Sequence, residues 1–272
     1  MPKYETAEAW WRSVLTGVNP PVPLRQFRDL LGLIPSSERC KFCNAPYSGP
    51  SAPLLRLLGR GPSKMMRLVC HQCDVEANKH LGGAEVEATW LFADVRGSTA
   101  LAEQMSAVEF SRLINRFYSA ATGVFIRSKA WCDRLVGDEV FGIYLPGFAG
   151  PEHSRLAVQA AQELLRVTGH ADPNGPWLPV GVGVHTGVAF MGAMGAKGGP
   201  TDITALGDNV NIAARLASKA GPGEVLISDA AYSAAGLDLG PLEQRALELK
   251  GKSEPVNVRV ARVSAKRLEV SL

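Results

Sequence analysis

The stretch RLVGDEVFG (residues 134–142) sets Gly137 and Asp138 between two apolar runs. A Gly-Asp pair in that setting is a strong hairpin signal, because glycine accepts the backbone angles of a tight turn and the flanking residues favour strands. The stretch therefore predicts two adjacent antiparallel strands with an acidic side chain at the turn between them.

A second acidic turn lies upstream in FADVRGST (residues 92–99). It follows a strand-like run over residues 85–92 and precedes a predicted helix over about residues 99–105. The carboxylate of Asp94 thus meets free backbone N–H groups where that helix begins. We expect Asp94 and Asp138 to lie side by side at the ends of neighbouring strands.

A helix predicted to begin near Asp208 carries an amide and a guanidinium on one face. Asn211 and Arg215 stand four residues apart, and residues at that spacing lie above one another on a helix. Mg²⁺ prefers oxygen ligands and takes one or two protein carboxylates together with substrate phosphates. The two acidic turns and this helix therefore indicate a divided site for nucleoside triphosphate chemistry.

Four separated stretches resemble, in their order and spacing, the catalytic domain of class III nucleotidyl cyclases. They are FADVRGST (92–99), RLVGDEVFG (134–142), GVHTG (183–187) and TALGDNVNIAARL (204–216). The resemblance covers roughly residues 84–262 and leaves out residues 1–83. It implies an α+β fold with a ferredoxin-like βααββαβ plan, which agrees with the predicted order of strand, two helices, hairpin, helix and strand.

Two domains are expected: an N-terminal helical and cysteine-containing module at residues 1–83 and a catalytic domain at residues 84–263. Short helices are predicted over residues 6–16 and about 24–33 of the module. In the catalytic domain, Ser106-Ala107-Val108-Glu109 has the pattern of a capping box and predicts the start of a long helix.

The resemblance assigns roles to five residues. Asp94 and Asp138, with the carbonyl of Val95, match the ligands of two Mg²⁺ or Mn²⁺ ions. Arg215 matches the arginine that stabilises charge on the transferring phosphoryl group, and Asn211 matches the asparagine that orients the ribose. The implied reaction is in-line attack of the ribose 3′-hydroxyl on the α-phosphorus of ATP, which forms 3′,5′-cyclic AMP and pyrophosphate.

The resemblance also implies a homodimer with shared active sites. In the family, the metal-binding aspartates come from one protomer and the base-contacting and transition-state residues from the other. One symmetric dimer would then hold two sites across an isologous interface.

Base selection rests on Arg134, which stands where adenylyl cyclases commonly have lysine, and on Thr204. Adenine N1 accepts a hydrogen bond and its 6-amino group donates one, so a cationic donor and a hydroxyl acceptor suit ATP. Guanine has an N1–H donor that Arg134 leaves without a partner, at a cost of about 1–3 kcal/mol. Cytosine shows the same acceptor and donor pair as adenine. A pyrimidine cyclase or a guanylyl cyclase therefore remains an alternative to an adenylyl cyclase.

A nucleotide-binding sensor module with little catalysis is a further alternative, although the metal-binding and transition-state residues of the motifs are all present. A diguanylate cyclase would usually carry a D-x-D-x-F-K segment, and this chain has FADVRGST at that place. A nucleic-acid-binding zinc ribbon would need aromatic and basic residues to alternate, and the cysteine module offers Phe42 and Tyr47.

Two C-x2-C knuckles, separated by 26 residues, lie in the N-terminal module. Four thiolates with no vacant position describe a structural zinc site, and an iron–sulfur cluster is the main alternative. Disulfides are disfavoured because the chain reads as intracellular. The expected ligands are Cys40, Cys43, Cys70 and Cys73; His71 or His80 is a possible replacement ligand, and Cys132 is expected to be a small buried residue.

Length and composition fit a cytoplasmic enzyme of one main domain with an accessory segment, and the resemblance implies a nucleoside triphosphate as substrate. The chain has 272 residues, 46% hydrophobic content and a formal net charge of +3, so no nucleic-acid partner is expected. Neither a signal-peptide core nor a membrane-spanning run is found in the sequence. A basic patch over residues 54–67 is interpreted as a solvated face, and His185 and Lys250 are interpreted as structural and solvated residues, respectively.

Overall fold

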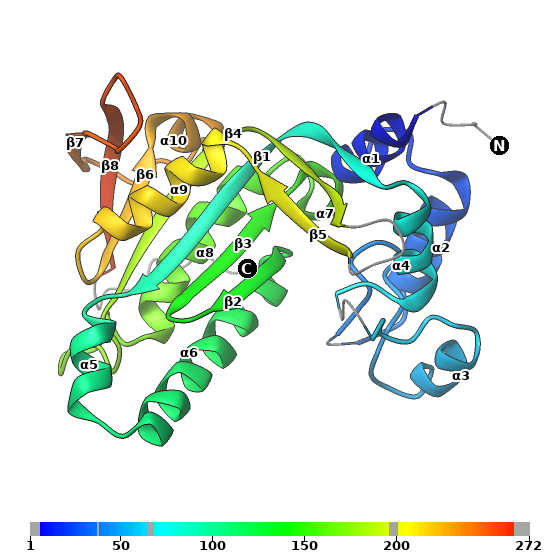
Figure 1. Ribbon diagram of the computed structural model, residues 1–272, viewed down its shortest axis with the longest axis horizontal. Helices are drawn as coiled ribbons and strands as arrows, with labels where there is room; N and C mark the ends of the chain where they lie inside the picture. Colours follow the sequence, from blue (N-terminus) through cyan, green and yellow to red (C-terminus); the bar gives the residue numbers. More distant parts are fainter. Residues whose placement is uncertain (1–5, 37, 65–67, 196–200, 264–272) are drawn as a thin grey trace. The chain divides into compact units, whose positions relative to one another are not determined.

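The structure is a computed structural model that describes residues 6–36, 38–64, 68–195 and 201–263. The chain forms two compact units. The cysteine unit takes the chain up to Val86 together with residues 145–150 and 189–206, and the sheet unit takes residues 87–144, 151–188 and the chain from Gly207 onward. Each unit therefore draws on segments that are far apart in the sequence (Figure 1).

The strands form one mixed sheet in the order β2-β3-β1-β4-β6-β8-β7, with β5 paired to β4 off this path. The strands are β1 (Gly82–Val95), β2 (Trp131–Val136), β3 (Glu139–Tyr144), β4 (Val180–Gly195), β5 (Thr201–Leu206), β6 (Glu224–Ser228), β7 (Glu243–Leu247) and β8 (Val256–Arg262). The helices of the sheet unit are α5 (Ser98–Gln104), α6 (Ala107–Arg127), α8 (His153–Val167), α9 (Asp208–Lys219) and α10 (Asp229–Ala235).

Within the sheet unit, the order β1-α5-α6-β2-β3-α8-β4 confirms the predicted βααββαβ plan. β1 pairs with β3 in antiparallel fashion from Thr89–Tyr144 to Asp94–Glu139, and β4 pairs with β6 in parallel. The predicted capping box is also present: the Ser106 hydroxyl accepts from the Glu109 N–H, and the Glu109 carboxylate accepts from the Ser106 N–H at 2.9 Å. Local sequence chemistry thus sets where α6 begins.

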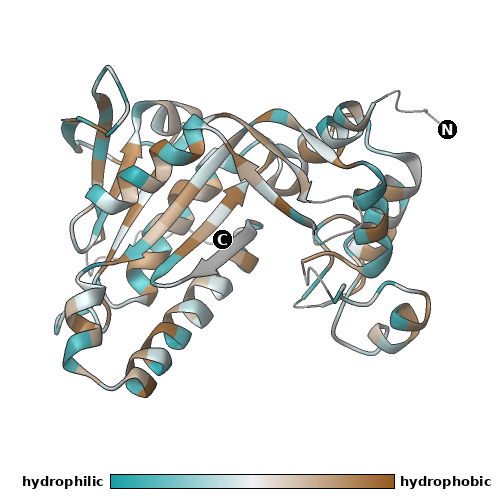
Figure 2. Ribbon diagram, in the orientation of Figure 1, coloured by the Kyte–Doolittle hydropathy of each residue, from teal (hydrophilic) through white to brown (hydrophobic). Residues whose placement is uncertain are grey.

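The core of the sheet unit is aromatic and aliphatic, with Trp90, Trp131 and Phe117 fully buried. Figure 2 shows apolar residues along much of β1 and β3, and apolar alternating with polar residues along α6. At Gly183 a Cβ would lie 2.3 Å from the Ala217 nitrogen, so the α9 backbone packs directly on β4. This close approach fixes the position of α9 against the sheet.

The cysteine unit contains α1 (Ala7–Thr16), α2 (Val22–Gly32), α3 (Ala52–Leu57), α4 (His71–Lys79) and α7 (Pro146–Ala149). Trp11 is fully buried and its indole N–H donates to the His80 carbonyl at 2.7 Å. Phe148 of α7 stacks on Phe42 with ring centroids 5.8 Å apart. At Gly147 a Cβ would lie 2.4 Å from the Val14 carbonyl oxygen, so only glycine allows α7 to approach α1 this closely.

Helices predicted over residues 6–16 and 24–33 are confirmed as α1 and α2, although α2 begins two residues earlier than expected. In the described part of the chain, no helix has both the length and the apolar character needed to span a bilayer. The division into domains at residues 1–83 and 84–263 stays a prediction.

Candidate active site

The two predicted acidic turns meet at one end of the β1–β3 pair. Asp94 near the end of β1 is paired in register with Glu139, and the Val95 N–H donates to the Asp138 carbonyl at 3.1 Å. Gly137 adopts a φ of +62°, the left-handed conformation that the tight turn requires. The expected proximity of Asp94 and Asp138 is confirmed by these contacts.

Three carboxyl groups lie close together at this turn. Burial raises the pKa of the Asp94 carboxyl, the nearby Arg96 guanidinium opposes that rise, and Asp138 adds to it. Burial also raises the pKa of Glu139 to about 7, with further repulsion from Asp94 and Asp138. Sequence reasoning missed Glu139 as a third member of this carboxylate group; its signal was the strand register that pairs it with Asp94. Such a concentration of oxygen ligands suits a divalent cation.

Arg96 is a second residue that sequence reasoning missed. Its guanidinium forms an ion pair with Asp94 and donates to the Ser218 carbonyl of α9 at 2.8 Å. Its backbone N–H donates to the Pro179 carbonyl, also at 2.8 Å. Arg96 therefore links the acidic turn to the C-terminal end of α9.

Asn211 and Arg215 lie on α9, as predicted, with Asn211 exposed and Arg215 half-buried. The Arg215 guanidinium lies near Gly251, where an added Cβ would be 3.7 Å from Nη2. The loop that contains Gly251 is tied to the start of α9 by an ion pair between Lys252 and Asp208. A fixed backbone therefore surrounds a partly exposed guanidinium and an exposed amide, both of which are available to a ligand.

The structure describes the side chain of only one of the two predicted base-selecting residues. Arg134 belongs to β2, which has an irregular register between Cys132 and Arg134, and its side chain lies outside the described residues. Thr204 is a buried residue of β5, 6% exposed, and pairs with Gly192 of β4 in the cysteine unit. The role of both residues stays a prediction.

His185 is a buried structural residue, in agreement with the expectation from the sequence. Its Nε2–H donates to the Asn209 side-chain oxygen and its Nδ1 accepts from the Ser228 hydroxyl, each at 2.8 Å. Burial lowers the pKa of His185. The neutral imidazole therefore ties the first turn of α9 to Ser228, which caps α10. Lys250 is exposed, as expected.

The four predicted cysteines come together in the cysteine unit. Their sulfur atoms all lie within 4.8 Å of one another, and all four residues are buried with free thiols. The backbone N–H groups of Cys43 and Cys70 point at the Cys40 sulfur at 3.5 and 3.3 Å. Convergent sulfur atoms and donors that stabilise thiolates fit a tetrahedral metal site.

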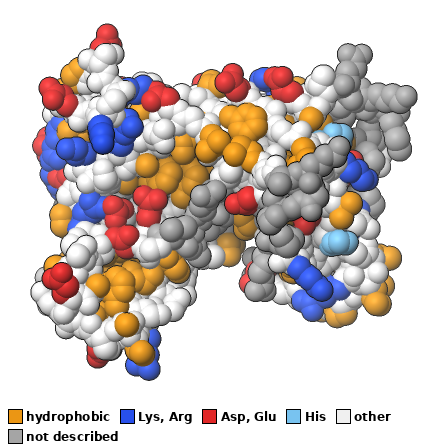
Figure 3. All heavy atoms as spheres, in the orientation of Figure 1, with side chains coloured by type: hydrophobic (Ala, Val, Ile, Leu, Met, Phe, Trp, Pro, Cys, Tyr) orange, Lys and Arg blue, Asp and Glu red, His pale blue; other side chains and the backbone are white. Residues whose placement is uncertain are grey.

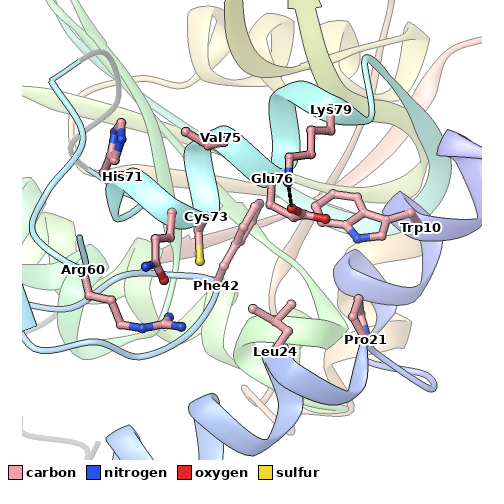
Figure 4. Close-up of a pocket in the computed structure, with 11 residues that line it drawn as sticks. Trp10, Pro21, Leu24, Phe42, Arg60, His71, Cys73, Val75, Glu76 and Lys79 are labelled. Carbon is pink, nitrogen blue, oxygen red and sulfur yellow. Dashed lines mark hydrogen bonds and ion pairs between the residues drawn. The ribbon is translucent and has the colours of Figure 1, made fainter. Parts of the chain in front are cut away.

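A hollow of about 580 Å³ lies beside this cysteine cluster. Figure 4 shows side chains of α2, of the first knuckle and of α4 around it, with Glu76 paired to Lys79. Phe42 and Cys73 line its wall, and the Glu76–Lys79 ion pair measures 2.8 Å. The cluster is therefore buried but lies close to the surface of its unit.

Comparison with known proteins identifies relatives of the chain. A cyclase from Anabaena cylindrica named adenylate cyclase is 28% identical over 160 residues, which are 57% of this chain and 31% of that protein. An adenylate cyclase of Mycobacterium bovis is 29% identical over 170 residues, 61% of this chain and 37% of that protein. The chain thus spans about a third of the length of these curated relatives.

Solved structures show the same fold. The guanylyl cyclase Cya2 superposes with a TM-score of 0.60 at 25% identity, over 68% of this chain and 96% of that one. The adenylyl cyclase CyaB from P. aeruginosa superposes with a TM-score of 0.59 at 27% identity, over 69% and 98%. The family model described as the adenylate and guanylate cyclase catalytic domain matches residues 84–260, which is more than half of the chain. The protein therefore belongs to the class III adenylate and guanylate cyclases.

Proposed function

We propose that the protein converts ATP to 3′,5′-cyclic AMP and pyrophosphate. The observation that carries this proposal is the contact between the turns of Asp94 and Asp138, in a unit whose α9 presents Asn211 and Arg215. These are the four residues that the chemistry of the family requires, and they stand on separate elements held by backbone packing.

Asp94 and Asp138, with the carbonyl of Val95, hold two Mg²⁺ or Mn²⁺ ions in this proposal. The raised pKa of Asp94, to which Asp138 contributes, supports the fit, because a divalent cation offsets the repulsion between the carboxylates. When bound, the ions supply Lewis-acid chemistry to the ribose 3′-hydroxyl and the triphosphate. The two carboxylates fix where the triphosphate sits relative to the N-terminus of α5.

Arg215 stabilises the charge that develops on the α-phosphoryl group, and Asn211 orients the ribose. Arg215 is half-buried beside Gly251, so its guanidinium is partly positioned before substrate binds. Asn211 is exposed on the same face of α9. Both residues act on a substrate that spans from α9 to a pair of carboxylates.

A homodimer supplies the second half of each site in this proposal, with the carboxylates from one protomer and Arg215 and Asn211 from its partner. Arg134 and Thr204 select adenine through a donor to N1 and an acceptor for the 6-amino group. A guanylyl or pyrimidine cyclase is the second candidate, since structures that share this fold include both a guanylyl and an adenylyl cyclase.

The N-terminal module, residues 1–83, holds one Zn²⁺ through Cys40, Cys43, Cys70 and Cys73. The convergence of four buried sulfur atoms supports this assignment. An iron–sulfur cluster on the same four thiolates is the alternative. Zinc has a structural role here, because four thiolates leave no open position for a substrate.

A nucleotide panel tests the proposal. The purified protein is incubated with ATP, GTP, CTP or UTP in Mg²⁺ or Mn²⁺, and cyclic products are detected by mass spectrometry. Cyclic AMP is expected as the main product. A different cyclic nucleotide as the main product would reject the adenine assignment and keep the cyclase, whereas no cyclic product from any of the four would leave a nucleotide-binding sensor.

A further inference from the structure

Three leucines at the end of α3 face solvent together. Leu54, Leu57 and Leu58 are 63%, 86% and 57% exposed, and their spacing of three and four residues places them on one side of the helix. Leu55, the residue after Leu54, is 9% exposed and anchors α3 in the cysteine unit. We call Leu54, Leu57 and Leu58 the leucine tip.

Hydrogen bonds hold the helix that carries the leucine tip. The Arg60 N–H donates to the Leu55 carbonyl at 2.8 Å, and the Arg56 guanidinium donates to the Tyr47 carbonyl at 3.0 Å. Buried Leu55 and these hydrogen bonds mean that the leucines are presented without a folding step. Exposed apolar side chains on an ordered helix cost free energy in water and usually mark a contact surface.

Basic residues are frequent in the sequence on both sides of the tip. Residues 39–73 contain six Arg and Lys residues and no Asp or Glu. Arg56, Arg60 and Lys64 lie on α3 or just after it. A zinc ion on four thiolates would contribute a charge of −2, which leaves the segment clearly positive. Figure 3 shows hydrophobic and basic side chains next to each other where α3 lies.

We propose that the leucine tip is a docking surface for an anionic lipid bilayer. Leucines on one helix side can enter the interfacial region of a bilayer while adjacent Arg and Lys side chains meet lipid phosphates. The Asp74 carboxylate is held by the Ser63 hydroxyl beyond this stretch, and the basic residues that lie on α3 or follow it favour an anionic surface as the partner. Docking through the leucine tip does not depend on which nucleotide the sheet unit uses.

Binding should be reversible and sensitive to salt, because three leucines and a few cations form a small contact. Two tips in a dimer would strengthen binding through avidity. The full chain is therefore tested at low ionic strength, by co-sedimentation with sucrose-loaded vesicles. One vesicle type contains equal amounts of phosphatidylglycerol and phosphatidylcholine, and the other contains phosphatidylcholine alone.

The protein is expected to sediment with the anionic vesicles and to remain in solution with phosphatidylcholine. Leu57→Asp should weaken that binding by about tenfold or more, since it puts a charge where apolar contact is needed. The matched control is Val108→Asp: Val108 is 60% exposed on α6 of the sheet unit, and its variant should bind vesicles like the wild type. Arg60→Gln with Lys64→Gln should reduce both the binding and its salt dependence.

Metal content and cyclase activity without vesicles report whether each variant is folded, and Leu57→Ser replaces Leu57→Asp if the latter fails that check. Equal binding to both vesicle types, or unchanged binding by the Leu57 variant, would overturn the proposal. Failure of the wild type to bind either type would overturn it and point to a protein partner. Self-association of the wild type that Leu57→Asp abolishes in the absence of lipid would also overturn it, because a second copy would then cover the tip.

Discussion

The sheet unit buries Trp90, Trp131 and Phe117 between strands and long helices, whereas the cysteine unit gathers its core around Trp11, Phe42 and four thiols. The number of exposed large aliphatic side chains also differs between the two units. Among the described residues, the exposed large aliphatic side chains of the cysteine unit are Val18, Leu30, Leu33, Leu54, Leu57, Leu58, Val75, Leu81 and Leu206, and those of the sheet unit are Val108, Ile126 and Val188.

The difference shows how each unit is stabilised. A large apolar core stabilises the sheet unit mainly through burial. The cysteine unit leaves more large aliphatic side chains in water, so we expect a metal on its four thiols to add to its stability. We therefore expect loss of the cysteine cluster to unfold the cysteine unit and to leave the sheet unit folded.

The largest expected effect comes from breaking that cluster. Cys43→Ser should unfold the cysteine unit, because binding of structural zinc by four thiolates contributes about 10–16 kcal/mol in small zinc domains. Hydrogen exchange should show lost protection in α1 and α4 and retained protection in β6 and β8. The wild type should contain about one zinc per chain by elemental analysis. Zinc-free protein, or a brown protein absorbing in the visible, would contradict the zinc assignment.

A second prediction concerns chemistry in the sheet unit without loss of its fold. Asp94→Asn or Asp138→Asn should lower turnover by about a hundredfold or more, since each metal ion contributes several kcal/mol to the transition state. Asp238→Asn is the control, because that exposed carboxylate serves a local turn. Turnover is measured in saturating Mn²⁺. A variant at Asp94 or Asp138 that keeps more than about a tenth of wild-type turnover would remove that residue from the metal site.

These two predictions rest on features that could be predicted from the sequence. The hairpin signal at Gly137 and Asp138, the helical spacing of Asn211 and Arg215 and the C-x2-C spacing within each cysteine knuckle are all local. Each pattern depends on residues close together in the chain, and the backbone geometry of a turn or helix then places their side chains.

Other parts of the site depend on tertiary structure and were not predicted. Glu139 joins the carboxylates through the register of β1 with β3, and Arg96 reaches Ser218 because α9 packs on the sheet there. Gly147 and Phe148 pack in the cysteine unit although they follow β3, far along the chain from α1. A local sequence pattern does not indicate which distant segment of the chain makes such a contact.

A third prediction tests whether two chains share each site. Asp94→Ala and Arg215→Ala homodimers should each be inactive. Mixing them should give heterodimers in which one site carries both changes and the other carries neither, so activity should recover to about a quarter of wild type after random subunit exchange. Recovery is measured after exchange has been verified with differently tagged subunits. A mixture that stays inactive would mean that one chain supplies all the residues of a site.

The smallest expected effect concerns the acid stability of the sheet unit. The Glu224 carboxylate is 10% exposed and accepts from Arg245 at 2.8 and 2.9 Å and from Arg262 at 2.5 Å. The Arg245 guanidinium in particular lowers the pKa of Glu224 from 4.5 to about 2. Because the folded-state pKa lies below the unfolded value, this pairing stabilises the fold fully above about pH 4.5 and is lost as the pH falls towards about 2.

That shift corresponds to at most about 3 kcal/mol of unfolding free energy. Glu224→Gln should therefore remove part of the pH dependence of stability between about pH 4.5 and 2, measured by urea titration of the hydrogen-exchange protection of β6 and β8. Glu248→Gln, at an exposed position, should leave that dependence unchanged. Cysteine thiolates release zinc as they protonate, so acid should open the cysteine unit before the sheet unit in the wild type. If both units unfolded together at every pH, their stabilities would be coupled, and the cysteine cluster and the apolar core would not stabilise separate units.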